Sequence, residues 1–328
     1  MSTSVSASAP GKALISGEYA VLHGAPAVVM ALDRRARVTV DHSSGDSHEV
    51  TAPGFSDVVG RFEVDSGRLR WLDGDVDVYR LFHTVIDAAA PEFDRPLRFN
   101  LDTRSFTAPA SGQKLGFGSS ASLASALAVA LDAVSGNDVL PLLAAASGHR
   151  EFQSGQGSGA DVAAALAGGL IEYRMGETGW TVLDWPVGLR YRYFYSGVSA
   201  DTRERIARAA VTDEAPNALM DASAIVAESF RSGNPRIIIA ALRNYCAALR
   251  DYSDRLDLDI YGAGHDLLAD AADDLGVVYK PCGAGGGDIG MVIAHEDASV
   301  ELFSALASAN SFEPLDVELD PLGARVSE

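Results

Sequence analysis

Lysine is rare in this chain and occurs in only three places. Of 328 residues, 23 are arginine and three are lysine, namely Lys12, Lys114 and Lys280. Each lysine lies within or beside a glycine-containing segment. Because arginine is the usual cation here, a retained lysine indicates a site that needs a compact ammonium group instead of a planar guanidinium. We therefore expect these segments to bind anionic groups; the alternative is that the lysines fall there by chance.

The segment 114–122, KLGFGSSAS, is the clearest candidate for an anion site. It stands directly before a long alanine- and leucine-rich stretch with helical spacing. Glycines let a backbone turn its N–H groups inward, and a helix N-terminus adds partial positive charge. The two serines can cap the helix or ligate Mg²⁺. Since the lysine precedes the glycines, this is not a G-x-x-x-x-G-K-[ST] loop. We predict a phosphate-binding loop that consists of Lys114, Gly116, Gly118, Ser119, Ser120 and Ala121.

An aspartate follows a second glycine-containing segment. Residues 153–160, QSGQGSGA, run into Asp161 at the expected start of a helix. A carboxylate in this position can simply interact with the helix dipole. Alternatively, it orients or deprotonates the group that attacks a phosphate. The sequence leaves both interpretations open.

The first and last lysines begin two further segments. Lys12 follows Pro10 and Gly11 at the start of a strand, so it is either solvated or directed into a cleft. Lys280 begins KPCGAGGGDIG, in which five of the eight residues 283–290 are glycine. So many glycines cost backbone entropy, which indicates a close approach by a ligand or another segment. A strand is expected next and not a helix, so the G-x-G-x-x-G spacing here does not predict a dinucleotide site.

Composition excludes several classes of protein. The net charge of −19 argues against nucleic acid and anionic membrane surfaces as partners. No apolar run is long enough for a membrane helix, and the first ten residues do not resemble a signal peptide. Two cysteines are too few for a disulfide framework, so we expect a reducing, cytoplasmic setting. Metalloprotease and serine hydrolase motifs are absent from the sequence.

The elements that position these segments alternate between strands and helices. We expect a strand at 13–16, two separate strands at 27–32 and 37–41, and a hairpin from 276–280 and 290–295. Other strands are expected at 97–101, 170–174, 180–185, 191–195 and 315–319. Helices are expected at 78–90, 119–134, 140–152, 161–168, 200–210, 218–231, 235–256, 265–275 and 298–309. This mixed order predicts an α+β protein and not a doubly wound parallel sheet.

Taken together, these segments resemble the motifs of the GHMP kinases. Residues 9–24 look like the first motif of that family, 114–122 like its phosphate loop, and 280–290 like its C-terminal glycine loop. The resemblance spans nearly the whole chain. It implies a two-domain α+β fold, with a ribosomal protein S5 domain 2-like domain at 1–187 and a ferredoxin-like domain at 188–328. The active site would lie in the cleft between them.

The resemblance also implies a reaction. Within the family, the segment 149–163 and the C-terminal motif are most similar to the phosphomevalonate kinases, whereas residues 17–24 also look like the mevalonate kinases. The implied activity is phosphoryl transfer from ATP, with Mg²⁺, to 5-phosphomevalonate. The alternatives are mevalonate or another small-molecule acceptor, and a non-catalytic nucleotide-binding relative. The chain would act as a monomer or homodimer, without nucleic acid or membrane partners.

The resemblance assigns roles to individual residues. Lys12 and Asp161 would be catalytic. Ser119, Ser120 and Glu151 would be candidates for Mg²⁺ ligands. The expected acceptor-binding residues are Glu18, Tyr19, His149, Gln153, Ser158, Gly159, Arg203, Lys280, Gly283, Ala284 and Gly285.

Overall fold

The computed structural model describes residues 4–108, 112–199, 205 and 216–327. Arg203, which we expect to bind the acceptor, and nearly all of the helix expected at 200–210 lie outside these residues. Of the helices that are described, none combines the length and the apolarity that crossing a bilayer requires.

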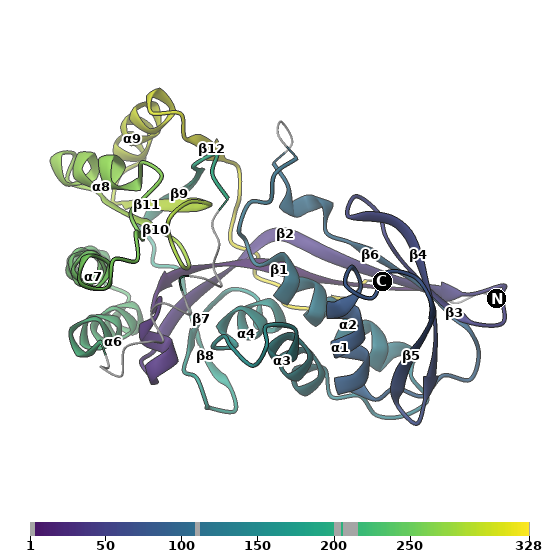
Figure 1. Ribbon diagram of the computed structural model, residues 1–328. Helices are drawn as coiled ribbons and strands as arrows, with labels where there is room; N and C mark the ends of the chain where they lie inside the picture. The colour runs from purple at the N-terminus through teal and green to yellow at the C-terminus, as the bar shows by residue number, and fades with distance from the viewer. Residues whose placement is uncertain (1–3, 109–111, 200–204, 206–215, 328) are drawn as a thin grey trace.

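A large sheet forms one half of the molecule (Figure 1). Its strand order is β13-β1-β2-β6-β3-β4-β5, and β7 and β8 extend it from the other half of β2. The strands are β1 Val5–Ser16, β2 Ala27–His42, β3 His48–Ala52, β4 Ser56–Asp65, β5 Arg68–Asp73, β6 Leu97–Asp102, β7 Leu170–Tyr173, β8 Trp180–Leu183 and β13 Arg325–Val326. The helices of this half are η1 Ala20–His23, α1 Arg80–Ala89, η2 Arg104–Phe106, α2 Ser119–Val134, α3 Pro141–Phe152 and α4 Ala160–Ala167.

A smaller antiparallel sheet forms the other half. Its order is β10-β11-β9-β12, and each neighbouring pair is antiparallel. The strands are β9 Arg190–Tyr195, β10 Val278–Pro281, β11 Ile289–Ala294 and β12 Glu313–Leu315. The helices are α6 Asn217–Ser232, α7 Pro235–Leu256, α8 His265–Asp274 and α9 Asp297–Ala309. The predicted α+β class is thereby confirmed. The chain passes from the larger sheet to the smaller one between β8 and β9, and β13 returns to the larger sheet.

The long β1–β2 hairpin connects the two halves (Figure 1). Its inner positions share one hydrophobic core with the smaller sheet, so that Ile15 and Val28 belong to the same buried cluster as Tyr193. A register irregularity between Pro10 and Gly11 interrupts the pairing immediately before Lys12. Such an irregularity re-aims the following side chain. A side chain at position 11 would not fit, because a Cβ atom would lie 2.9 Å from the carbonyl oxygen of Phe117.

Three sequence-based expectations about strands need correction. The two strands expected at 27–32 and 37–41 are one strand, β2, because Arg34 and Arg35 bond to the C-terminal segment instead of forming a turn. Strands β3, β4 and β5 were not expected at all. The last predicted strand, at 315–319, is displaced: β12 covers Glu313–Leu315.

Candidate active site

The glycine loop before α2 has the backbone of an anion site. Gly116 and Gly118 have φ angles of +73° and +77°, in the left-handed region that favours glycine. Gly118 is the N-cap of α2 and offers no capping side chain, so the first N–H groups of the helix are available to a ligand. A cavity of about 380 Å³ opens here, and Lys114, Ser119 and Ser120 line it. Its other walls are largely apolar and include Tyr79, Phe82, Phe106 and Leu123.

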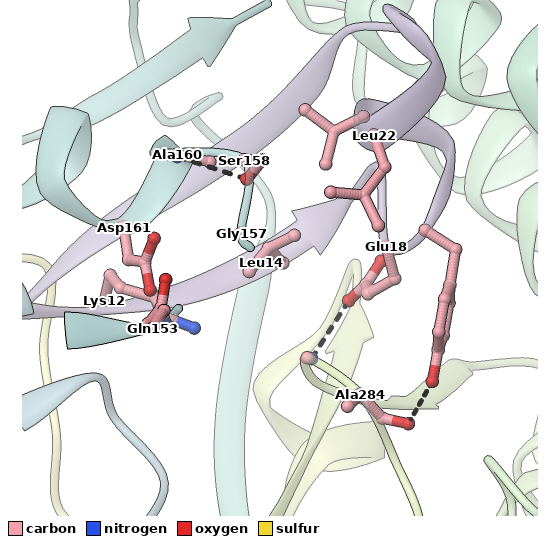
Figure 2. Close-up of a pocket in the computed structure, with 13 residues that line it drawn as sticks. Lys12, Leu14, Glu18, Leu22, Gln153, Gly157, Ser158, Ala160, Asp161 and Ala284 are labelled. Carbon is pink, nitrogen blue, oxygen red and sulfur yellow. Dashed lines mark hydrogen bonds between the residues drawn. The ribbon is translucent and has the colours of Figure 1, made fainter. Parts of the chain in front are cut away.

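Lys12 and Asp161 lie on the other side of this loop, in a second cavity of about 110 Å³. Figure 2 shows their side chains next to each other, with Gln153 beside them. The Lys12 side chain also packs against the phosphate loop, since a Cβ atom added at Gly118 would lie 2.9 Å from the Cε atom of Lys12. The lysine therefore reaches both the helix start and the aspartate.

The charge of Asp161 is stabilised by its surroundings. Burial raises the pKa of this carboxyl, but His149, Lys12 and the backbone N–H groups of Asp161 and Val162 together outweigh that effect, so the pKa is lowered overall. Asp161 is therefore ionised at neutral pH.

His149 contacts the phosphate loop and interacts electrostatically with Asp161. It is buried in α3, and its Nε2 atom lies 3.1 Å from the hydroxyl oxygen of Ser120. Burial lowers the pKa of His149; Lys12 and Lys114 lower it further, against the opposing effect of Asp161. The polar contact of His149 is with Ser120 of the phosphate loop, which differs from its expected role of binding the acceptor directly.

The wall opposite Asp161 comes from two segments that are distant in sequence. Glu18, Tyr19 and Leu22 belong to the turn between β1 and β2, whereas Gly283 and Ala284 belong to the C-terminal glycine loop. The Tyr19 hydroxyl donates to the carbonyl oxygen of Ala284 at 2.7 Å (Figure 2). Gln153 and Ser158 complete the cavity from the segment before α4.

Two residues of the C-terminal motif do not line this cavity as we expected. Lys280 is fully buried, and its ammonium group donates to Glu18 Oε1 at 2.5 Å and to the carbonyl oxygen of Leu14 at 3.2 Å. Gly285 packs behind the loop, where a Cβ atom would lie 2.5 Å from the carbonyl oxygen of Ile260. The backbone at Gly285 and Gly286 thus lies close to Ile260. The carbonyl oxygen of Ile260 accepts the N–H of Gly286 at 2.7 Å.

The remaining predicted residues lie near the site in different ways. Gly159 is the N-cap of α4, with a φ angle of +84°. Glu151 is exposed and lines neither cavity, so it does not fit a metal ligand. Within the described residues, no cluster of three His, Cys, Asp or Glu side chains is arranged to hold a metal ion. The hydroxyls of Ser119 and Ser120 and the carboxylate of Asp161 fit Mg²⁺ that is bound mainly through nucleotide phosphates.

Several lining residues were not singled out individually from the sequence. Leu14, Val21 and Leu22 are apolar residues of an ordinary strand and turn, yet they line the smaller cavity. The apolar walls of the larger cavity were likewise unforeseen. Only their position beside Ser119 in the folded chain distinguishes them from other core residues.

Comparisons with known proteins agree with this arrangement. Residues 80–169 match the family model of the GHMP kinases N terminal domain. A phosphomevalonate kinase of Streptomyces sp. (strain CL190) is 26% identical, over 90% of this chain and 91% of that protein. A mevalonate kinase of Methanothermobacter thermautotrophicus is 36% identical, over 51% of this chain and 49% of that protein.

A solved structure extends the match to the whole fold. The phosphomevalonate kinase of Streptococcus pneumoniae, in complex with phosphomevalonate and AMPPNP, is 20% identical and has a TM-score of 0.78. The alignment covers 96% of this chain and 99% of that one. Residues 80–169 thus match the N-terminal domain of the GHMP kinases, and the whole chain shares the fold of the Streptococcus pneumoniae enzyme.

Proposed function

We propose that this chain transfers the γ-phosphoryl group of ATP to the phosphate of 5-phosphomevalonate, giving 5-diphosphomevalonate. The observation that carries the proposal is the placement of Lys12. Its side chain lies against Gly118 of the phosphate loop and beside Asp161 in the adjoining cavity. A cation in this position stabilises negative charge on a phosphoryl group that passes from one cavity to the other.

The larger cavity would hold ATP. Its apolar walls suit a base and ribose, while the N-terminus of α2, Lys114, Ser119 and Ser120 would hold the phosphates. Mg²⁺, when bound, would neutralise the phosphate charges, with a serine hydroxyl as its protein ligand. His149 would orient the hydroxyl of Ser120.

The lowered pKa of Asp161 favours a phosphate acceptor over an alcohol. An alcohol must lose a proton as it attacks, and an aspartate with a lowered pKa removes protons poorly. A terminal phosphate is already anionic at pH 7, because its second pKa is about 6. Asp161 then needs only to hold Lys12 and the acceptor in line.

Mevalonate is the second candidate acceptor. The observation that favours it is the shortage of positive charge near the smaller cavity. Lys12 is the one cation among the described residues that line it, and Arg150 lines only a neighbouring cavity that shares Gln153, Gly157 and Ser158. An acceptor with a single carboxylate would need fewer cations than one that also carries a phosphate.

An acceptor panel tests the proposal. ADP release would be measured with purified protein, ATP and Mg²⁺, and with phosphomevalonate, mevalonate, homoserine or galactose as acceptor. We expect turnover with phosphomevalonate at a kcat/KM at least about a hundredfold above that for mevalonate, since more than 2 kcal/mol of specific binding would depend on the phosphate. Preferential turnover of mevalonate would instead identify the second candidate, and turnover of neither would refute both.

A further inference from the structure

A buried polar network lies directly behind the outer wall of the acceptor cavity. Lys280 and Glu18 form an ion pair of 2.5 Å, and each side chain is only 1% exposed. The Tyr245 hydroxyl donates to the other carboxylate oxygen of Glu18 at 2.5 Å. The same hydroxyl accepts the backbone N–H groups of Gly17 and Glu18, both at 3.0 Å. Each polar atom of the Glu18 carboxylate therefore has a partner inside the protein.

The network joins three distant parts of the fold. Glu18 belongs to the turn after β1, Tyr245 lies in the middle of α7, and Lys280 belongs to β10. None of the three side chains forms a hydrogen bond that the backbone of its own helix, strand or turn requires. Burying two charges is unfavourable unless their partners are well placed, so a network of this kind is retained where it fixes a particular conformation.

The conformation that it fixes is that of the turn at 17–19. Gly17 has a φ angle of +103°, and a Cβ atom there would lie 2.5 Å from Ala27 Cα. Tyr19 has a φ angle of +60°, which is unusual for an aromatic residue. Such a turn persists only when its surroundings hold it. Here the two N–H groups bound by Tyr245 and the carboxylate bound by Lys280 hold it.

This turn and the C-terminal glycine loop form the wall of the cavity. Tyr19 and Leu22 come from the turn, and Gly283 and Ala284 from the loop. Glu18 ties the two together, because its Oε1 atom also accepts the N–H of Gly283 at 3.3 Å. A change in the network would therefore alter the acceptor cavity, whereas the nucleotide cavity is built from other segments.

We propose that Glu18, Tyr245 and Lys280 are positioning residues that set the shape of the acceptor cavity, and that Lys280 does not contact the acceptor. The proposal rests on the proposed function only in taking this cavity as the acceptor site. It differs from the role that the sequence suggested for Lys280, because the ammonium group is directed to Glu18 and Leu14.

The mildest test is Tyr245→Phe, which removes one oxygen atom and leaves Glu18 and two N–H groups short of a partner. We expect the KM for the acceptor to rise about tenfold, kcat to change less than about threefold, and the KM for ATP to stay constant. The matched control is Tyr191→Phe, which removes a hydroxyl that accepts the N–H of Leu319 and that lines neither cavity. An unchanged acceptor KM in Tyr245→Phe, or an equal rise in both KM values, would overturn the proposal.

A double variant separates positioning from direct binding. Lys280→Met leaves a buried, unpaired carboxylate, so we expect a lower Tm and a higher acceptor KM. In Glu18→Gln/Lys280→Met the buried charge is gone, and we expect most of both losses to be recovered. If Lys280 held the acceptor, the double variant would bind it no better than Lys280→Met, and the proposal would fail.

The unfolding measurements keep this test separate from the proposed function. If the wild type phosphorylates no acceptor in the panel, the proposed function is wrong. The Tm values of the wild type, both single variants and the double variant then still report whether residues 18 and 280 are coupled. Additive effects of the two substitutions on Tm would refute the network by themselves.

Discussion

At the scale of single residues, the site depends on a carboxylate that stays ionised although it is enclosed. Burial acts against the charge of Asp161, and Lys12, His149 and two backbone N–H groups act for it. The net lowering of its pKa means that Asp161 stays ionised throughout the neutral range. In the proposed reaction it would orient the acceptor without changing its own protonation state, while Lys12 would stabilise the phosphoryl group.

Asp161→Asn should retain the fold and lose activity. The substitution keeps the shape of the side chain but removes the charge that holds Lys12 and the acceptor. We expect turnover to fall about 10²- to 10⁴-fold, measured as ADP release at saturating ATP and acceptor, with an unchanged circular dichroism spectrum. Asp132→Asn, an exposed residue of α2, is the control. Near-normal turnover of Asp161→Asn would exclude this residue from the mechanism.

Residue type revealed part of the site but not how each residue is used. The rarity of lysine drew attention to Lys12, which lines the cavity. The same argument drew attention to Lys280, which is instead buried in an ion pair with Glu18. Tyr245, which completes the pair, lies in the middle of a long helix. Nothing in its neighbouring sequence distinguishes it from other core tyrosines, because its partner is 227 positions away.

At the scale of elements, the helices were easier to predict than the strands. The bounds of α2 and α7 agree with the sequence-based expectation, because glycines mark the start of α2 and Asn234-Pro235 marks that of α7. Strands β3, β4 and β5 were not predicted, because they carry many charged residues and expose one face. They join the sheet through the pairing of β3 with β6, which depends on tertiary contacts that no local pattern encodes.

The start of α2 offers a test of the phosphate loop. In Gly118→Ala, the added methyl group would strain a backbone at φ +77° and displace the end of Lys12. We expect kcat/KM for ATP to fall about tenfold or more, together with a loss of about 1 kcal/mol in stability. Gly233→Ala has the same backbone strain at φ +65° but no atom within 4 Å, so it should lose stability alone. Equal activities in the two variants would contradict the role of this loop.

His265 makes the contact between α8 and the C-terminal glycine loop sensitive to pH. Its Nδ1 atom lies 2.7 Å from the Tyr279 hydroxyl, and its Nε2 atom lies 3.2 Å from the carbonyl oxygen of Gly287. Burial lowers its pKa to about 4. Between pH 6.5 and 4 the unfolded chain therefore binds a proton that the folded chain does not. Stability should fall as the pH decreases through this range.

His265→Gln measures that contribution. Over the whole range, the histidine should account for about 3 kcal/mol of the acid-induced loss in unfolding free energy. Denaturant titrations of the wild type and the variant at pH 7 and pH 4 would give the difference. Exposed His295→Gln serves as the control. If His265→Gln lost as much stability on acidification as the wild type, this residue would not be the source.

At the scale of the whole molecule, the C-terminal segment connects the two sheets. It leaves the smaller sheet at β12 and returns to the larger one at β13, beside β1. Arg35 of β2 binds it along the way. Its guanidinium pairs with Asp320 at 2.5 Å and donates to the carbonyl oxygens of Leu322 and Gly323, both at 2.9 Å. The same group donates to Ser8 of β1. One side chain thus holds three segments together.

Arg35→Met should therefore weaken the connection between the halves. Both partners are nearly buried, with side chains 12% and 10% exposed, so the substitution leaves Asp320 and two carbonyl oxygens without their donor. We expect a loss of about 3 kcal/mol, seen as a lower Tm in calorimetry and as an earlier transition for the smaller half.

Arg70→Met is the control, because it removes an exposed pair with Glu63 and should cost at most about 1 kcal/mol. Because Arg35 lines neither cavity, the acceptor KM at low temperature should stay within about twofold of wild type. Equal Tm values for the two variants would mean that the C-terminal segment does not depend on Arg35.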